Sequence, residues 1–210
     1  MSRWEPNARG RLQQAALELF RERGYGETSV AQIAARAGLT ERTFFRYFVD
    51  KREVFFWGAG AFQAQLIAAV RALPRAATPL EAIEAALRAA ASAIGAHGDW
   101  GRARHALISA NKELEERELI KLAALASAMA AALRKRGVGE PAASLSAEAA
   151  IAILKTAYER WACDNGRNEL WHHMRESLDE LSALTSGERR PAPPQKSPRA
   201  PARPRGGASS

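Results

Sequence analysis

The segment from Thr40 to Phe48 interleaves hydroxyl and guanidinium side chains with aromatic rings. In a helix, Phe44 and Phe48 lie one turn apart on a face that we expect to pack on Ile33 and Phe20. The opposite face then presents the hydrogen-bonding side chains of Thr40, Arg42, Thr43, Arg46 and Tyr47. Hydroxyl and guanidinium groups suit the base edges and phosphates of a duplex. The segment therefore predicts a helix that reads the major groove of double-stranded DNA.

Two cations follow this helix directly. Lys51 and Arg52 lie where the backbone amides of a new helix have no intrahelical acceptor, which is a favourable place for a phosphate. We expect Lys51, Arg52 and Tyr47 to contact phosphates, and Arg42, Thr43 and Arg46 to read bases. Periodicity alone leaves one alternative open, a three-helix bundle with a merely basic surface.

Short capped helices must position these residues. Ser29 and Gln32 have the spacing of a capping box for a helix that ends at Ala37, and Thr40 is the expected N-cap of the helix over 41–48. Gly38 separates the two, so residues 29–48 have the dimensions of a helix-turn-helix. A preceding helix over 7–23 ends at Gly24, where a left-handed residue is easiest.

The rest of the chain up to about residue 185 has helical periodicity and no sustained β alternation. Asp50 and Glu53 form a second capping-box pattern, and the helix that starts there is predicted to run through Gly58 and Gly60 to Leu73. These two glycines suggest a pivot between the DNA reader and the body. Further helices are predicted over 78–97, 100–109, 114–136, 146–165 and 168–184. The expected fold class is all-α.

Several stretches between Leu12 and Val54 resemble the DNA-binding domain of tetracycline-repressor (TetR) type regulators. They read Leu-Gln-Gln-Ala-Ala-Leu-Glu-Leu-Phe from Leu12, Gly-Tyr from Gly24, Thr-Ser-Val-Ala-Gln-Ile-Ala-Ala-Arg-Ala-Gly-Leu-Thr from Thr28, Thr-Phe-Phe-Arg-Tyr-Phe from Thr43, and Asp-Lys from Asp50. The resemblance covers about a quarter of the chain, and its small and aromatic residues are in register. The remainder agrees with the family in size and helix count but has no diagnostic motif.

The resemblance implies a homodimeric bacterial transcription factor, usually a repressor, whose C-terminal domain binds a small effector and then releases DNA. It places Thr43 and Tyr47 at DNA-contacting positions, Lys51 at a phosphate, and Ser29 at the cap of a helix that abuts the DNA backbone. The family often has Tyr where this chain has Phe45. The Phe45 ring can pack on sugar and backbone, but it has no hydroxyl for a phosphate.

The predicted body, residues 55–185, should hold both a dimer interface and an effector pocket. Apolar stripes on the last two helices suggest a four-helix bundle between two subunits, although they could equally face the core of one chain. The stripe residues are Ile151, Leu154, Leu170, Met174, Leu178 and Leu181. Candidate pocket walls are aromatic or titratable, and each is otherwise an ordinary core residue: Trp57, Phe62, Trp100, His105, Tyr158 and Trp161.

Charge gathers at the two ends of the chain. The formal net charge is +8, residues 61–185 are neutral in sum, and residues 186–210 carry six basic and one acidic side chain together with six prolines. A polyanionic partner such as nucleic acid fits this distribution, and so does a solvated basic surface. We expect residues 186–210 to form a disordered tail, either unattached or in contact with DNA phosphates.

Other classes find little support in the sequence. The single Cys163 suits a reducing cytoplasm and a small buried residue better than a nucleophile, and no signal peptide or membrane span is expected. His172 and His173 point about 100° apart on a helix, which is poor for a shared metal. No cofactor, metal or enzymatic activity is predicted. The expected organisation is a DNA-binding domain over 7–54, a sensing and dimerising domain over 55–185, and the tail. The rival interpretation is a helical DNA-binding protein without an effector.

Overall fold

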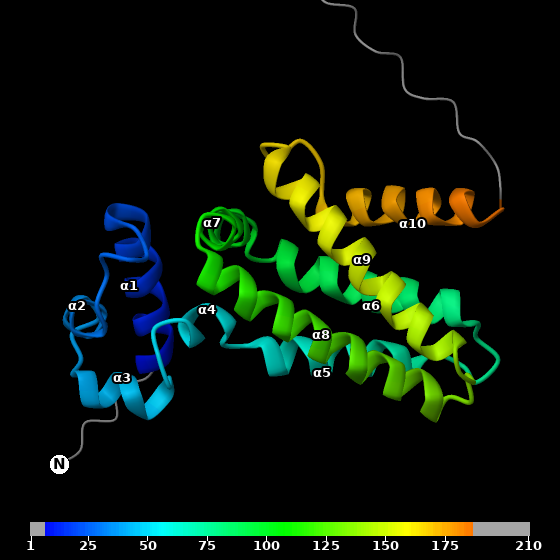
Figure 1. The fold of residues 1–210 in the computed structure, drawn as a ribbon, viewed down its shortest axis with the longest axis horizontal. Coiled ribbons are helices and arrows are strands. Elements are labelled where there is room, and N and C mark those ends of the chain that lie inside the picture. Colours follow the sequence, from blue (N-terminus) through cyan, green and yellow to red (C-terminus); the bar gives the residue numbers. More distant parts are fainter. Residues whose placement is uncertain (1–6, 187–210) are drawn as a thin grey trace, which may run out of the picture.

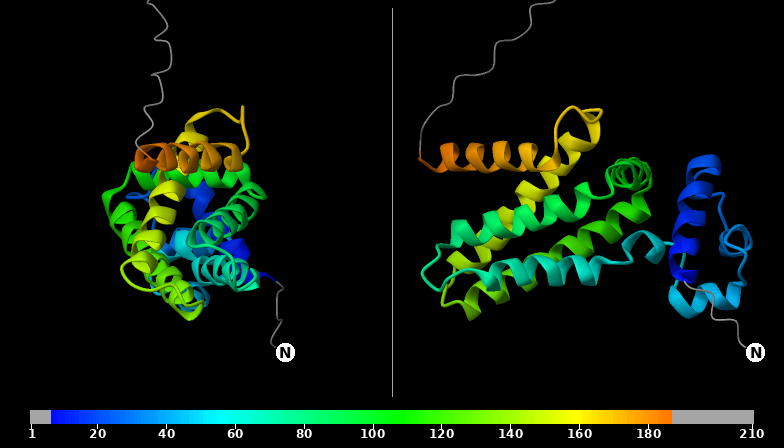
Figure 2. Two further views of the ribbon diagram at one scale, coloured as in Figure 1. Left: turned by 90° about the vertical axis from the view of Figure 1, so that its right-hand side faces the viewer. Right: turned by 180° about the vertical axis from the view of Figure 1, so that it is seen from behind.

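The computed structural model of the chain describes residues 7–186, and within this range it contains helices and no strand. The all-α expectation is confirmed. The first four helices of the chain form one end of the molecule, and the six that follow form the body (Figure 1). Seen from behind, the first three helices remain grouped at one end of the elongated body (Figure 2).

The first group comprises α1 Ala8–Arg23, α2 Val30–Arg36, α3 Glu41–Tyr47 and α4 Glu53–Phe56. Gly24 ends α1 with φ +85°, as expected. At the start of α2, Gln32 Oε1 accepts from the Ser29 amide at 2.8 Å, and Ser29 Oγ accepts from the Gln32 amide at 3.2 Å. Thr40 Oγ1 caps α3 by accepting from the Thr43 amide at 3.2 Å. The predicted caps are therefore confirmed.

The core of this group is aromatic and aliphatic. Phe44 and Phe48 are buried together with Ile33 and Phe20, as the spacing predicted. Ile108 of α7 (Gly98–Ser109) and Leu114 of α8 (Lys112–Lys135) belong to the same buried cluster. The end formed by α1 to α4 is therefore packed directly on the body.

The predicted helix from Asp50 to Leu73 is wrong as a single element. It is divided into α4 and α5 Ala59–Ala72, with Trp57 and Gly58 between them. Gly58 has φ +90°, a conformation that costs other residues a steric clash. Since this left-handed residue interrupts the helical hydrogen-bond ladder, α5 restarts after it.

The body consists of α5, α6 Pro79–Gly95, α7 Gly98–Ser109, α8 Lys112–Lys135, α9 Ala142–Cys163 and α10 Leu170–Ser186. Thr78 and Glu81 form the capping box of α6, with Pro79 as its first residue. Helices α5, α6, α8 and α9 lie side by side around a second buried cluster, and α10 packs across α9 and α6 (Figure 1).

By length and composition alone, the stretch Glu53–Ala72 is apolar enough to cross a membrane. It is divided at Gly58, and its Leu66, Ile67 and Val70 are buried in the second cluster. Because a core helix passes the same test of composition, this stretch is weak evidence for a membrane span. The predicted tail, apart from Ser186, lies outside the described residues.

Candidate nucleic-acid interface and candidate ligand site

The outward face of α3 differs sharply from its inward face. Arg42 and Arg46 are exposed, Thr43 and Tyr47 are half-buried, and the Phe45 side chain is 55% exposed. Arg42 makes no hydrogen bond or ion pair with any residue in 7–186, so its guanidinium is free to bind a partner. This face therefore offers guanidinium, hydroxyl and aromatic groups on one short helix.

Two hydroxyls predicted to contact DNA already act as helix caps. Ser29 Oγ and Thr40 Oγ1 accept backbone amides, and Thr40 Oγ1 also lies 3.0 Å from Thr43 Oγ1. A hydroxyl has one donor and two acceptor positions, so each can still bond one further group. Their first task, however, is to fix where α2 and α3 begin.

A row of stacked cations and rings crosses the end of α3. The Arg46 guanidinium lies 4.9 Å from the Tyr47 ring centre, and Arg46 Nη2 donates to Tyr47 Oη at 3.2 Å. Arg9 of α1 lies 5.1 Å from the rings of both Tyr47 and Trp57. Sequence reasoning did not include Arg9, because no local pattern shows that α1 crosses both rings.

Lys51 makes contacts within the chain that the sequence did not predict. Its ammonium donates to the carbonyl oxygens of Tyr25 at 2.9 Å, Gly26 at 3.4 Å and Thr28 at 3.1 Å, and it lies over the Tyr25 ring at 4.2 Å. These bonds occupy all three ammonium donors. Lys51 therefore holds the loop between α1 and α2, and its predicted contact with a phosphate stays a prediction. Burial raises the pKa of Tyr25 to about 12, so the ring beneath Lys51 stays neutral.

Arg52 is exposed but paired. Its Nε and Nη2 donate to Asp50 Oδ2 at 3.0 and 2.6 Å, while Asp50 Oδ1 accepts the backbone amides of Arg52 and Glu53 at 2.8 and 3.1 Å. Asp50 thus accepts the first amide of α4, but the helix begins at Glu53 with Arg52 as its N-cap residue, two residues later than the predicted capping box placed it. The reciprocal half of that capping box is absent, because the Glu53 carboxylate turns to the body instead. A phosphate would share Arg52 with Asp50.

Glu53 connects α4 to α8. Its carboxylate accepts from Arg117 Nη2 at 2.5 Å and from Lys121 Nζ at 3.4 Å. Nearby, Arg104 of α7 pairs with Glu118 at 2.8 Å, and its Nε approaches the Phe55 carbonyl oxygen at 3.4 Å. These part-buried charges join α4, α7 and α8 where the two buried clusters meet.

The six predicted pocket residues do not line one site. Trp57 is 46% exposed beside Arg9, Trp100 packs on the first buried cluster, and Phe62 packs on the second. His105, Tyr158 and Trp161 do come together, with Tyr158 stacked on Trp161 at 5.7 Å and edge-on to His105 at 5.5 Å. Trp161 also lines a hollow of the surface.

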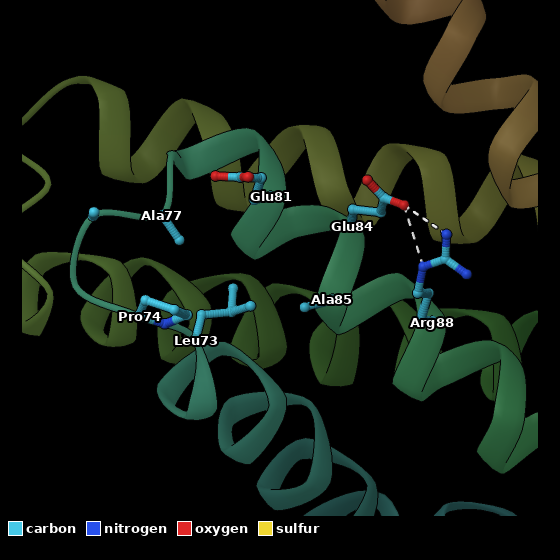
Figure 3. A pocket seen from close by; sticks show the side chains of 8 residues that line it. Leu73, Pro74, Ala77, Glu81, Glu84, Ala85 and Arg88 are labelled. Atoms are coloured by element: carbon cyan, nitrogen blue, oxygen red, sulfur yellow. Dashed lines mark hydrogen bonds and ion pairs between the residues drawn. The ribbon is translucent and has the colours of Figure 1, made fainter.

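That hollow, of about 650 Å³, lies among α6, α7, the end of α9 and the start of α10. A second hollow of about 490 Å³ lies where α5 turns into α6 (Figure 3). In the second hollow Glu84 bonds Arg88 at 2.8 and 3.2 Å, and the Glu81 side chain caps α6. The charges of the second hollow are therefore largely satisfied within α6.

The predicted dimer stripes lie inside the protomer. Because α10 packs on both α9 and α6, the two stripes meet within one chain, which is the alternative that the sequence left open. Five of the six side chains are buried and Leu181 packs partly buried against them: Ile151, Leu154, Leu170, Met174 and Leu178. On the outer side of α10, Leu184 is exposed. Between residues 7 and 186 no group of three or more His, Cys, Asp or Glu side chains is placed to hold a metal ion.

Two known families match this chain, one over its first helices and one over most of its body. The family described as "Bacterial regulatory proteins, tetR family" matches residues 12–56, which include α2, α3 and α4. The family described as "MftR C-terminal domain" matches residues 77–186, from the start of α6 to the end of α10.

Individual relatives agree with these matches. The transcriptional regulator TcmR of Streptomyces glaucescens is 41% identical over 81 residues, which are 39% of this chain and 36% of that protein. The chain thus matches only about a third of the length of TcmR. The putative mycofactocin biosynthesis transcriptional regulator MftR of Mycobacterium tuberculosis is 26% identical over 156 residues, 73% of this chain and 79% of MftR. The Bacillus subtilis regulator FadR, solved with stearoyl-CoA, has the same fold with a TM-score of 0.62 at 18% identity, covering 82% of this chain and 96% of FadR.

Proposed function

The chain belongs to the TetR family of bacterial transcriptional regulators, and we propose that it represses transcription from the cytoplasm by binding a palindromic operator as a homodimer. In this proposal a small organic effector binds the body and releases the protein from DNA. The observation that carries it is the exposed, hydrogen-bonding face of α3, held rigid by the buried aromatic face on its other side.

The residues of this face divide by task. Arg42, Thr43 and Arg46 are proposed to read base edges, since guanidinium and hydroxyl groups match the pattern of the major groove. Tyr47 and Arg52 are proposed to contact phosphates, and the exposed Phe45 ring to pack on sugar and backbone. Ser29, Thr40 and Lys51 act mainly by fixing the helix starts and the loop before α2.

Dimerisation is proposed because a single helix-turn-helix is too small to read a whole palindromic operator. One helix-turn-helix reads a half-site, and two copies must place their α3 helices about 34 to 36 Å apart, or a multiple of this distance, on one face of the duplex. The exposed side of α10 is the proposed contact, because its inward stripe is already used. Sedimentation equilibrium of the wild type and of Leu184→Glu measures the equilibrium between monomer and dimer. The proposal expects a dimer that the substitution weakens.

Acyl-CoA thioesters are the first effector class to test, because FadR of the same fold was solved with stearoyl-CoA. The charged contacts of Glu53, Arg104 and Arg117 support a route by which a change in α7 or α8 reaches α4. A ligand releases DNA only if it binds the DNA-free conformation more tightly.

Fluorescence anisotropy with duplexes from the region beside the gene tests DNA binding, against a scrambled duplex at several salt concentrations. We expect specific binding with two protomers, or a multiple, per site. Arg42→Ala should weaken specific binding about ten- to a hundredfold and leave scrambled binding nearly unchanged. Arg71→Ala, on the exposed surface of α5, is the matched control. Equal weakening by both substitutions would contradict base readout by Arg42.

The same assay separates the two modes of control. If stearoyl-CoA or a shorter acyl-CoA lowers operator affinity, while coenzyme A alone does not, the effector proposal is supported. Specific binding that no thioester reverses would favour the rival interpretation of a DNA-binding protein without such an effector.

A further inference from the structure

We infer that the hollow between α6, α7 and α10 binds the acidic head of a small organic anion, with Arg102 as the group that recognises it. The inference rests on the proposed function only in taking this anion to be an effector. Arg88, Arg102 and Arg167 line the hollow together with one carboxylate, Glu169. Its volume of about 650 Å³ is within the usual range of about 300 to 1,000 Å³ for small-molecule sites.

Arg102 has unused hydrogen-bonding capacity. Its guanidinium makes no hydrogen bond with any residue of the described chain, and its Nε is buried without a partner. The nearest acid, Asp99, lies 3.7 Å from Nη1 on a fully exposed side chain, so it is a weak partner. A guanidinium has five N–H donors, and leaving them unfilled in a part-buried place is costly. Such a group is poised for an acceptor that comes from outside the chain.

Stacking on an aromatic ring, rather than hydrogen bonding, fixes the position of the Arg102 side chain. Its guanidinium lies 4.4 Å from the Trp161 ring, and Trp161 is buried and stacked on Tyr158. Tyr158 in turn donates to the Gly101 carbonyl oxygen at 2.7 Å. The guanidinium is thus oriented before any ligand arrives, which lowers the entropy that binding must offset.

Glycines provide the room for this arrangement. A Cβ at Gly101 would lie 3.1 Å from the Trp161 ring, and a Cβ at Gly98 would lie 3.3 Å from Arg102 Nη1. A Cβ at Gly166, which has φ +77°, would lie 3.4 Å from Arg102 Nη2. Two glycines of α7 and one of the loop between α9 and α10 therefore leave space around one cation and one ring.

The walls indicate the kind of ligand. Arg88 is already paired with Glu84 and stacked on Trp171 at 4.0 Å. The other charged residues of the lining are Arg102, Arg167 and Glu169, with a net charge of one before the exposed Asp99 beside Arg102 is counted. This balance suits a single carboxylate or phosphate group, which a guanidinium binds through two parallel hydrogen bonds. The remaining lining offers apolar surface for the rest of the ligand, from Ala91, Leu170 and Trp171.

Calorimetric titration of the full chain without DNA tests the inference with three probes of one chain length: octanoate, octyl phosphate and 1-octanol. We expect saturable 1:1 binding of at least one of the two anions, and the pair distinguishes a carboxylate from a phosphate ligand. Arg102→Gln should weaken that binding tenfold or more and leave any binding of 1-octanol unchanged. Arg175→Gln removes the same charge from the exposed side of α10 and should bind as the wild type does.

Arg102→Gln also removes the guanidinium that stacks on Trp161, so a second variant tests the hollow without changing that contact. Ser92→Trp places a large ring in the hollow from an exposed position on α6 and keeps every arginine, so it should block the anion while melting like the wild type. Absence of saturable binding by both anions overturns the inference, as does equal binding by the wild type and both hollow variants. DNA takes no part in these titrations. Failure of operator binding would therefore leave their result standing, and the converse also holds.

Discussion

At the scale of single residues, Lys51 and Arg102 show that position decides what a cation does. The three ammonium donors of Lys51 bond carbonyl oxygens of the loop between α1 and α2. Arg102 has a comparable charge but no hydrogen bond within the described chain, and it rests on Trp161. The first cation is therefore structural, and the second is available to a ligand.

Replacing Lys51 tests its structural role. Lys51→Met should lower the free energy of unfolding by about 1 to 3 kcal/mol, since it removes a charged donor from three part-buried carbonyl oxygens. The dependence of operator affinity on salt should stay nearly the same. Thermal and urea unfolding, with Arg52→Met as the control, measure the first effect. A variant as stable as the wild type, whose salt slope falls by about one, would restore the phosphate-anchor interpretation.

The pair of Asp164 and His173 predicts a dependence of stability on pH. The hydrogen bond from His173 Nε2 at 2.8 Å, helped by the amides of Gly166 and Asn168, lowers the pKa of Asp164 to about 2. Because the folded pKa lies below the unfolded value of about 4, this stabilisation is complete above pH 4 and is lost as the pH falls toward 2.

Asp164→Asn should therefore melt at a lower temperature than the wild type at pH 6. The difference should shrink between pH 4 and pH 2.5, because the wild-type carboxylate is then partly protonated. Differential scanning calorimetry across this range measures it. A difference that stays constant down to pH 2.5 would mean that the His173 contact contributes nothing through ionisation.

At the scale of elements, the break between α4 and α5 decides how the reader meets the body. Phe55 and Phe56 end α4 inside the first buried cluster, while Leu66 and Val70 of α5 belong to the second. Gly58, with φ +90°, turns the chain from one cluster to the other. Gly60 lies in the regular helix α5, so the two glycines that suggested a pivot are not equivalent.

Alanine substitutions separate them. Gly58→Ala should destabilise the protein by about 1 to 2 kcal/mol, because a Cβ disfavours the left-handed region. Gly60→Ala should be neutral or stabilising by up to about 1 kcal/mol, since nothing lies within 4 Å of the added Cβ. Chemical unfolding measures both. If Gly58→Ala is also harmless, and release from DNA by an effector is unchanged, Gly58 is not a pivot.

At the scale of the whole molecule, reader and body share one continuous interior. Ile108 of α7 and Leu114 of α8 complete the core of the DNA-reading end, and Glu53 is joined to Arg117 and Lys121 across the same junction. We therefore expect a displacement of α7 or α8 to displace α4 as well. The hollow beside Arg102 borders the start of α7, and Ile108 near the end of α7 lies in the buried cluster beneath α1 to α4, so α7 connects the proposed ligand site with the core that supports α3.

Glu53→Gln tests this coupling. It should lower stability by on the order of 1 kcal/mol, as expected for a half-exposed ion pair, and should reduce the ratio of operator affinities without and with ligand. Anisotropy titrations with the octyl ligand that binds the wild type measure this ratio. Glu159→Gln, which breaks an exposed pair with Lys155, is the control. An unchanged ratio for Glu53→Gln would show that the signal does not pass through this contact.

Local contacts explain why much of the reader was predictable. The caps of Ser29, Thr40 and Thr78 join residues three apart, and the buried face of α3 follows from one helical turn. Such features depend only on side-chain type and short spacing, so the local sequence is enough to predict them. The helix-turn-helix and the all-α class followed from them.

Contacts between distant segments were decided by the tertiary structure. Lys51 bonds carbonyl oxygens more than 20 residues away, and the apolar stripes of α9 and α10 face each other inside one chain. The Arg102 hollow gathers residues from Arg88 to Trp171. An apolar stripe is equally suited to its own core and to a partner, and a cation is equally suited to a carbonyl oxygen and to a phosphate. Only the packing of α10 on α6, and of the α1–α2 loop on Lys51, chose between these partners, because it set which groups lie within bonding distance.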